Sequence, residues 1–473
     1  MSLIHDPAPA DAGANTPHIP QQHHWSEWLV HRLHTWIGLL VGPFMLVAVF
    51  TGLFYVWTPQ IEAWAHRDLL RSGSAGEPVS LEQQIAIARR HLGAALPLSG
   101  VRPAPEPGGT TRVLFSDKSL GEGERVAVFI DPVQGRVLGQ SHVYGTSGAL
   151  PLRTWSSKLH RQLLQGENGR IYSELAASWL WVAALGGLFL WAVKRTRRQA
   201  TARRLPRKPL RDRHAHWGLW LLAGLLFLSA SGLTWSRFAG ENISQMRKAW
   251  GWGTPSLRTT LPGAGSPAIS PEHSDHSHGD APPAMPVASG LASFDQVLAA
   301  ARAYGIDAAR LEIRAPATPE KAWTVTEIDR RWPTQVDAVA VDGQSLQVVD
   351  AIRFETFPMA AKLTRWAVDL HMGVMFGVPN QLALTAVGAG LALMIAWGYT
   401  MWWRRRAQAQ PTLWQALARA SWPARLAMAA VAVALGWSLP VLGVSLLVFL
   451  VLDAVPVWRP AIALKRPAVQ EPR

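Results

Sequence analysis

Long apolar runs dominate the pattern of this chain of 473 residues. A helix that crosses a bilayer needs about 20 mostly apolar residues, and four runs meet that requirement. They lie at 35–57, 174–193, 216–235 and 381–403. A last apolar stretch, 426–457, has room for two short helices, and Ser438-Leu439-Pro440 near its middle predicts the turn between them.

The polar segments between these runs predict two soluble α+β modules on the same side of the membrane. Ser80 precedes a helical pattern with Gln83 in the capping-box position, and Ser293 is expected to cap a second helix. Alternating apolar residues then predict strands near 112–115, 125–130, 136–138, 311–314, 322–327, 339–341 and 346–349. Each half therefore reads as helix, α+β module, helix, which indicates an internal duplication.

The predicted fold is an all-α membrane core of four main transmembrane helices plus a C-terminal hairpin, with two external α+β modules. The predicted segments are a polar tail (1–24), transmembrane helix 1 (25–57), module 1 (58–154), transmembrane helix 2 with its preceding helix (155–194), a basic loop (195–213), transmembrane helix 3 (214–237), module 2 (238–361) with a His-rich loop (259–287), transmembrane helix 4 with its preceding helix (362–406), and the hairpin and tail (407–473).

The charge pattern agrees with a membrane protein and orients it. Only 16% of residues are charged, below the roughly 25% of soluble domains. Ten Lys or Arg lie between Lys194 and Arg213, and Arg404–Arg406 form a second cluster. Because cytoplasmic loops are enriched in Lys and Arg, both clusters and the N-terminus are expected in the cytoplasm of a multi-pass inner-membrane protein. No nucleic-acid-binding motif accompanies the net charge of +14, so nucleic acid is not expected as a partner.

The chain has no cysteine, which excludes thiolate metal sites, iron–sulfur clusters and covalent haem attachment through C-x-x-C-H. Histidines remain as ligands, and four of them occupy matching positions in the two halves. His34 and His214 each stand four residues before a glycine, Gly38 and Gly218. His160 and His371 each stand six residues before a glycine, Gly166 and Gly377.

These positions predict two sites, one at each face of the membrane. His34 and His214 begin spanning helices at the cytoplasmic face, whereas His160 and His371 precede spanning helices at the external face. Structural zinc prefers four ligands, but two imidazoles on opposite sides of a flat ring suit a six-coordinate haem, and the glycines leave room for the macrocycle. The competing interpretation is that histidines at helix ends bind nothing.

Other histidines leave alternatives open. His31 and His216 lie close to the inner pair and are alternative ligands. His273, His276 and His278 lie in the His-rich loop, where imidazole and carboxylate at short spacing suit a metal-scavenging tract or a plain polar linker.

Several motifs together resemble a known family. They are Arg32-Leu33-His34 with Gly38, Leu159-His160, Leu370-His371 with Gly377, Trp402-Trp403-Arg404, and Asp131-Pro132-Val133-Gln134-Gly135-Arg136-Val137-Leu138. Over about 25–406 the chain resembles the PepSY-associated transmembrane proteins, some of which are di-haem reductases. The resemblance implies two haems b, periplasmic PepSY modules, and an oxidoreductase that reduces a ferric siderophore or other ferric chelate for iron acquisition.

The electron donor and the competing functions follow from what the sequence lacks. No G-x-G-x-x-G follows a strand, so the donor is expected to be quinol or a separate cytoplasmic flavoprotein. A haem-free PepSY scaffold that binds a periplasmic partner is the alternative function. A permease is disfavoured because no charged residue lies within the four main spans between their ends.

Overall fold

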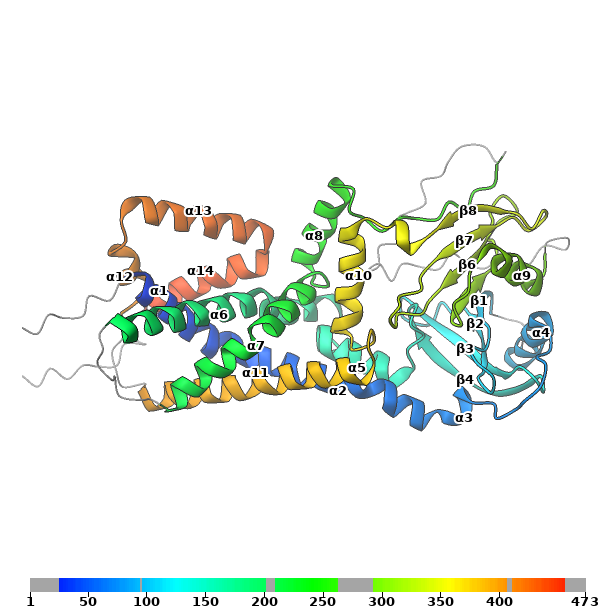
Figure 1. Ribbon diagram of the computed structural model, residues 1–473, viewed down its shortest axis with the longest axis horizontal. Helices are drawn as coiled ribbons and strands as arrows, with labels where there is room; N and C mark the ends of the chain where they lie inside the picture. The colour runs from blue at the N-terminus through cyan, green and yellow to red at the C-terminus, as the bar shows by residue number, and fades with distance from the viewer. Residues whose placement is uncertain (1–24, 94–95, 201–208, 263–291, 406–410, 456–473) are drawn as a thin grey trace, which may run out of the picture.

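The computed structural model describes residues 25–93, 96–200, 209–262, 292–405 and 411–455. The molecule is elongated, with a bundle of long helices at one end and a β-sheet at the other (Figure 1). We call the two ends of the helical bundle the sheet end and the far end.

Four helices of the bundle are long and apolar enough to cross a membrane, as predicted. The first is continuous from Trp25 to Ala65 and comprises α1 (Trp25–Trp36), a π-helical turn η1 (Ile37–Val41) and α2 (Gly42–Ala65). The others are α6 (Gly166–Ala200), α7 (Pro209–Leu233) and α11 (Val378–Arg405). The first helix continues beyond the predicted end at 57, and α7 begins and ends earlier than the predicted span 214–237. The chain is therefore a multi-pass membrane protein.

The C-terminal hairpin packs on this bundle and is shorter than the spans. Its helices are α12 (Leu413–Ala418), α13 (Trp422–Ser438) and α14 (Pro440–Ala454), so the predicted turn before Pro440 is confirmed. At 1.5 Å per residue, α13 and α14 extend only about 25 and 22 Å. The buried carboxylate of Asp453 fastens the hairpin, because it accepts hydrogen bonds from Arg32 Nε (2.7 Å), Trp36 Nε1 (2.8 Å) and the backbone N–H of Leu413.

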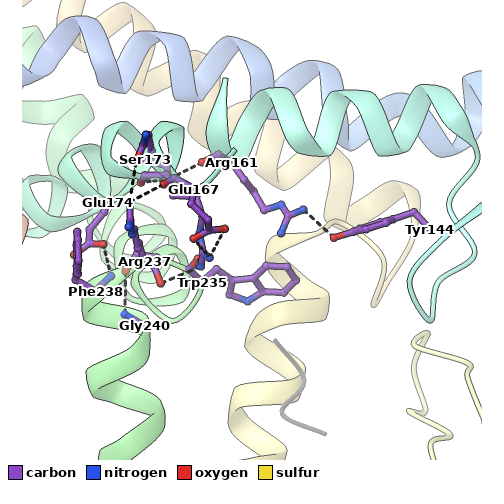
Figure 2. Close-up of polar contacts among 12 residues, drawn as sticks. Tyr144, Arg161, Glu167, Ser173, Glu174, Trp235, Arg237, Phe238 and Gly240 are labelled. Atoms are coloured by element: carbon purple, nitrogen blue, oxygen red, sulfur yellow. Dashed lines mark hydrogen bonds and ion pairs between the residues drawn. The ribbon is translucent and has the colours of Figure 1, made fainter. Parts of the chain in front are cut away.

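Short helices join the bundle to the sheet. They are α3 (Arg67–Leu70), α5 (Pro151–Gln162), α8 (Phe238–Ala249), η2 (Phe354–Thr356) and α10 (Met359–His371). The sequence interpretation missed α8, whose first turn is fixed by a buried carboxylate. Glu174 of α6 accepts hydrogen bonds from the backbone N–H groups of Phe238 (2.8 Å) and Ala239 (3.1 Å), as Figure 2 shows in part.

One antiparallel sheet of eight strands contains all the named strands, in the order β4-β3-β2-β1-β5-β6-β7-β8. The strands are β1 (Leu98–Arg102), β2 (Thr111–Phe115), β3 (Glu124–Asp131), β4 (Arg136–Tyr144), β5 (Leu311–Arg314), β6 (Trp323–Glu327), β7 (Ala338–Val341) and β8 (Val348–Ile352). The sequence predicts two α+β modules, and the structure joins their strands, β1–β4 and β5–β8, in this one sheet. The edge strands β1 and β5 pair at Val101 and Ile313, so each half covers the exposed edge of the other.

Two helices, α4 (Leu81–Leu92) and α9 (Phe294–Tyr304), pack near each other against the sheet and share one apolar core with it. Ser80 and Ser293 cap them as the sequence predicts, each accepting the backbone N–H three residues later. The two helix starts also cap each other. Asp295 accepts from the N–H of Leu81 (2.9 Å), and Glu82 accepts from the N–H of Phe294.

A buried carboxylate joins the two halves of the sheet. Glu312 of β5 bonds Arg102 Nη2 (2.5 Å) of β1 and Arg125 Nη1 (2.9 Å) of β3, and Arg314 Nε lies 2.6 Å away. Burial alone would raise the pKa of Glu312, but the three guanidinium groups hold it well below its usual range. The carboxylate is therefore ionised and neutralises part of a buried cluster of arginines.

We expect Glu312→Gln to destabilise the sheet by about 3 to 5 kcal/mol, because removing one partner of a buried ion pair leaves its arginines uncompensated. Chemical unfolding of the purified chain in detergent measures the change. The exposed Glu122→Gln is the matched control and should leave the unfolding curve in place. Equal effects of the two variants would contradict this role of Glu312.

The contact between the starts of α4 and α9 predicts a pH dependence of stability. Burial and the hydrogen bond to Asp295 raise the pKa of Glu82 to about 7, above its ordinary value of 4.5. The native state therefore binds the proton more tightly, so this stabilisation is complete below pH 4.5 and is lost as the pH rises through about 7. Unfolding midpoints measured across this range should fall with pH in the wild type and fall less in Glu82→Gln.

Candidate functional site

Two pairs of histidines face each other inside the bundle, and each pair takes one residue from each half of the chain. At the far end, the rings of His34 on α1 and His214 on α7 have their centres 6.2 Å apart at an angle of 90°. At the sheet end, the rings of His160 on α5 and His371 on α10 are 6.5 Å apart and tilted by 47°. The structure thus brings together the partners that the repeated spacing predicts.

Hydroxyl groups orient the sheet-end pair. Thr51 Oγ1 lies 3.0 Å from His160 Nδ1, and Ser231 Oγ lies 2.7 Å from His371 Nδ1. Each hydroxyl also donates to the carbonyl four residues earlier in its helix, Val47 (2.7 Å) or Phe227 (2.6 Å). A hydroxyl that already donates must accept from the ring, so Nδ1 carries the proton and Nε2 keeps its lone pair for a ligand.

A backbone carbonyl contacts one ring of the far-end pair, also at Nδ1. His214 Nδ1 lies 3.1 Å from the carbonyl oxygen of Met394 on α11. Because a carbonyl only accepts hydrogen bonds, Nδ1 of His214 is the protonated nitrogen. Metal-bound histidines usually donate their second ring nitrogen to such a partner, which fixes the ring orientation.

The orienting hydroxyls carry a sequence signal that the sequence interpretation missed. Thr51 follows His34 by seventeen residues, and Ser231 follows His214 by the same number. A glycine comes next in both halves, Gly52 or Gly232. A search for polar residues at matched distances from the repeated histidines would have found them.

Glycines leave space at the rings, but they are mostly not the predicted ones. A Cβ atom at Gly52 would lie 3.1 Å from the His160 ring, and one at Gly187 would lie 3.4 Å from the His34 ring. A Cβ at Gly232 would lie 3.9 Å from His371. Only the contact at Gly52 is tighter than ordinary van der Waals packing, so a side chain at that position would press on the His160 ring.

The four predicted glycines have different surroundings. Gly38 and Gly218 line a cavity at the far end, as predicted for residues that pack on a ligand. Gly166 and Gly377 have φ of +62° and +60° at the starts of α6 and α11, where a chain reversal requires glycine. Their role in packing a macrocycle stays a prediction.

The far-end cavity has a volume of about 1960 Å³ and includes both histidines of the pair. Pockets for drug-sized ligands are commonly about 300 to 1000 Å³, so a large planar ligand fits its volume. The π-helical turn η1 borders the cavity directly after α1. Such turns are frequent at functional sites, because they shift the side chains of one helical turn.

The first helix gives the distance between the two histidine pairs. His34 and Thr51, the partner of His160, lie on it seventeen residues apart, which corresponds to about 25 Å along a helix. A bilayer has a hydrocarbon core about 30 Å thick. The two histidine pairs are therefore separated by nearly the thickness of that core.

Polar contacts hold α5, which carries His160, in place. Tyr172 of α6 donates its hydroxyl to the carbonyl of His160, and Ser173 donates to the carbonyl of Arg161 (2.9 Å). The Arg161 side chain reaches Tyr144 at the end of β4, 3.2 Å away (Figure 2). At the start of α5, the buried Glu62 of α2 accepts from the N–H of Arg153 at 2.7 Å. The sheet and α2 thus fix the position of His160.

The distances between the rings fit a metal atom held between two imidazoles. A metal–imidazole nitrogen bond of about 2 Å on each side puts the ring centres about 6 Å apart. Within the described parts of the chain, no group of three or more His, Cys, Asp or Glu side chains could hold a metal ion. Two-ligand coordination of a planar metal complex, as in a six-coordinate haem, is the arrangement that the pairs suit.

The other histidines that the sequence singles out have different surroundings. His31 lines the far-end cavity one turn before His34. His216 Nε2 accepts a hydrogen bond from Trp220 Nε1 at 3.0 Å, so that nitrogen is engaged away from the pair. His273, His276 and His278 lie outside the described residues.

Comparison with known proteins establishes the family. No curated protein matches the chain. The family model of the PepSY-associated TM region matches residues 31–405, which include all four paired histidines and the whole sheet. The chain therefore belongs to the PepSY-associated transmembrane family.

Proposed function

We propose that the protein is a haem b reductase of the bacterial inner membrane that passes electrons across the bilayer to a periplasmic ferric chelate. One observation carries this proposal: two histidine pairs face each other across the two halves of the chain, separated by nearly the thickness of the bilayer core. A haem held by two histidines would have no open coordination position, which favours electron transfer over binding of a substrate to the metal.

The orientation of the chain supports this direction of transfer. Basic residues near the end of α6, at the start of α7 and at the end of α11 lie at the far end of the bundle, where Lys and Arg are typical of the cytoplasmic side. The N-terminus and the His34–His214 pair are then cytoplasmic, and the sheet with the His160–His371 pair is periplasmic. The like order of elements in the two halves supports an internal duplication that produced both PepSY modules.

The protein's own residues would hold the two haems and set their properties. His34 with His214, and His160 with His371, would hold a haem iron, and a haem at each pair would provide one-electron transfer. Thr51, Ser231 and the Met394 carbonyl keep Nδ1 protonated, so that Nε2 stays available and its basicity is increased.

The electron donor and the electron acceptor are assigned to opposite faces of the membrane. The donor is quinol or a cytoplasmic flavoprotein that reaches the far-end cavity. The acceptor is a ferric siderophore or similar ferric chelate, whose Fe(III) takes one electron and leaves as Fe(II).

The visible spectrum of the detergent-purified protein, oxidised and then reduced with dithionite, tests the proposal. We expect low-spin α and β bands and about two haems b per chain in a pyridine haemochrome assay. His34→Ala and His371→Ala should each remove about one haem, because each destroys one axial pair. His216→Ala is the matched control and should keep both haems.

A protein that is colourless as purified and takes up no added haemin would overturn the reductase. The haem-free PepSY scaffold would then account better for the fold. If His216→Ala lost haem and a variant of His34 or His214 kept it, His216 would be identified as a ligand of the inner haem in place of that residue.

The orienting hydroxyls give a second prediction. Thr51→Val and Ser231→Ala each remove the acceptor for a ring N–H, and loss of such a partner typically costs about 10- to 100-fold in metal affinity. We expect each variant to release the sheet-end haem faster to an apo-protein acceptor, with the far-end haem unaffected. Thr400→Val is the control, because its exposed hydroxyl also donates to the carbonyl four residues earlier (2.9 Å) but touches no histidine ring. Equal haem release in all three variants would contradict the orienting role.

A further inference from the structure

The far-end cavity carries more positive charge than its histidine pair requires. Six Lys or Arg side chains line it, against three acidic ones. The basic residues are Arg32, Lys194, Arg195, Arg211, Arg213 and Arg405, and the acidic residues are Glu27, Asp212 and Asp453. Arg195 and Arg213 are exposed and the other four are half-buried, so the cavity presents positive charge that would attract an anionic ligand.

Each of the three acids already has a basic partner. Asp453 binds Arg32 Nε at 2.7 Å, and Asp212 binds Lys194 Nζ at 2.6 Å. Glu27 binds Arg197, which is not among the residues that line the cavity, also at 2.6 Å. By number, the described lining still has more basic than acidic side chains.

Arg211 and Arg405 lie just beyond the His34–His214 pair, toward the far end. His31 precedes His34 by three residues and Arg211 precedes His214 by three, which is about 4.5 Å along each helix. Arg405, at the end of α11, lies with Arg211 within electrostatic range of His31. Cations from α7 and α11 therefore converge about one helical turn beyond the paired rings.

The opposite wall of the cavity is apolar. Met45, Leu180, Leu225 and Leu391 line it and are largely buried. A ligand in this cavity thus meets hydrocarbon toward the middle of the bundle and guanidinium groups toward the far end. This polarity matches a flat apolar molecule that carries acidic groups along one edge.

We propose that Arg211 and Arg405 bind the two carboxylates of the haem held by His34 and His214, and so fix how that haem is turned in the cavity. This inference rests on the proposed function. Buried carboxylates need charged hydrogen-bond donors, and arginine offers two parallel N–H groups to each carboxylate. The same positive charge stabilises the more negative, reduced form of the haem and raises its reduction potential.

A potentiometric titration of the full-length protein in detergent tests the assignment, with the visible spectrum as the readout. In Arg405→Gln and Arg211→Gln we expect one of the two haems to have a lower midpoint potential and the other to be unchanged. The affected haem should also be retained about tenfold less tightly, as for the loss of one charge-assisted hydrogen bond. Arg405→Lys keeps the charge and should restore most of the potential.

Arg404→Gln is the matched control, since Arg404 is an exposed neighbour on the same helix that is not among the residues lining the cavity. Wild-type protein without haem would overturn the proposed function and this inference together. Two bound haems with unchanged potentials and retention in both glutamine variants would overturn the inference alone. So would loss of a co-purified anionic phospholipid with unchanged haem potentials, because the arginines would then bind a lipid headgroup.

Discussion

Each histidine pair combines one ring from the first half of the chain with one from the second, and the rest of the structure serves this pairing. Neither half supplies both rings of a pair. The rings meet at about 6 Å only if the halves are held in one fixed relation at both ends of the bundle. The paired edge strands with Glu312 provide this at the sheet, and the packing of α6, α7 and α11 provides it within the bundle.

Buried carboxylates position the elements around the sites. Glu62 binds the start of α5, Glu174 the start of α8, and Asp453 the start of α12. In each case a carboxylate accepts backbone N–H groups that a helix start leaves without partners. An apolar environment strengthens these bonds and makes their loss costly, so short connecting helices become rigid supports.

The sequence predicted the four spans, the hairpin turn before Pro440 and the partners in each histidine pair, because apolar length and repeated spacing are local signals. It could not reveal that β1 and β5 join the two modules, since strand alternation does not specify which edge a strand meets. The start of α8 depends on Glu174, more than sixty residues away, and the glycines at the rings became visible only through contacts between helices. Such features depend on tertiary packing.

Because each pair combines histidines from both halves of the chain, the pairs can form only late in biosynthesis. Chains enter the membrane from the N-terminus, so α1 and α2 insert long before α7 and α10 exist. His34 can pair only after His214 has been synthesised. His160 can pair only after His371, which is made when most of the polypeptide has been translated. Neither pair can close on a nascent chain that stops after its first half. Under the proposed function, haem would bind only late in synthesis, and a product truncated after its first half would lack both sites.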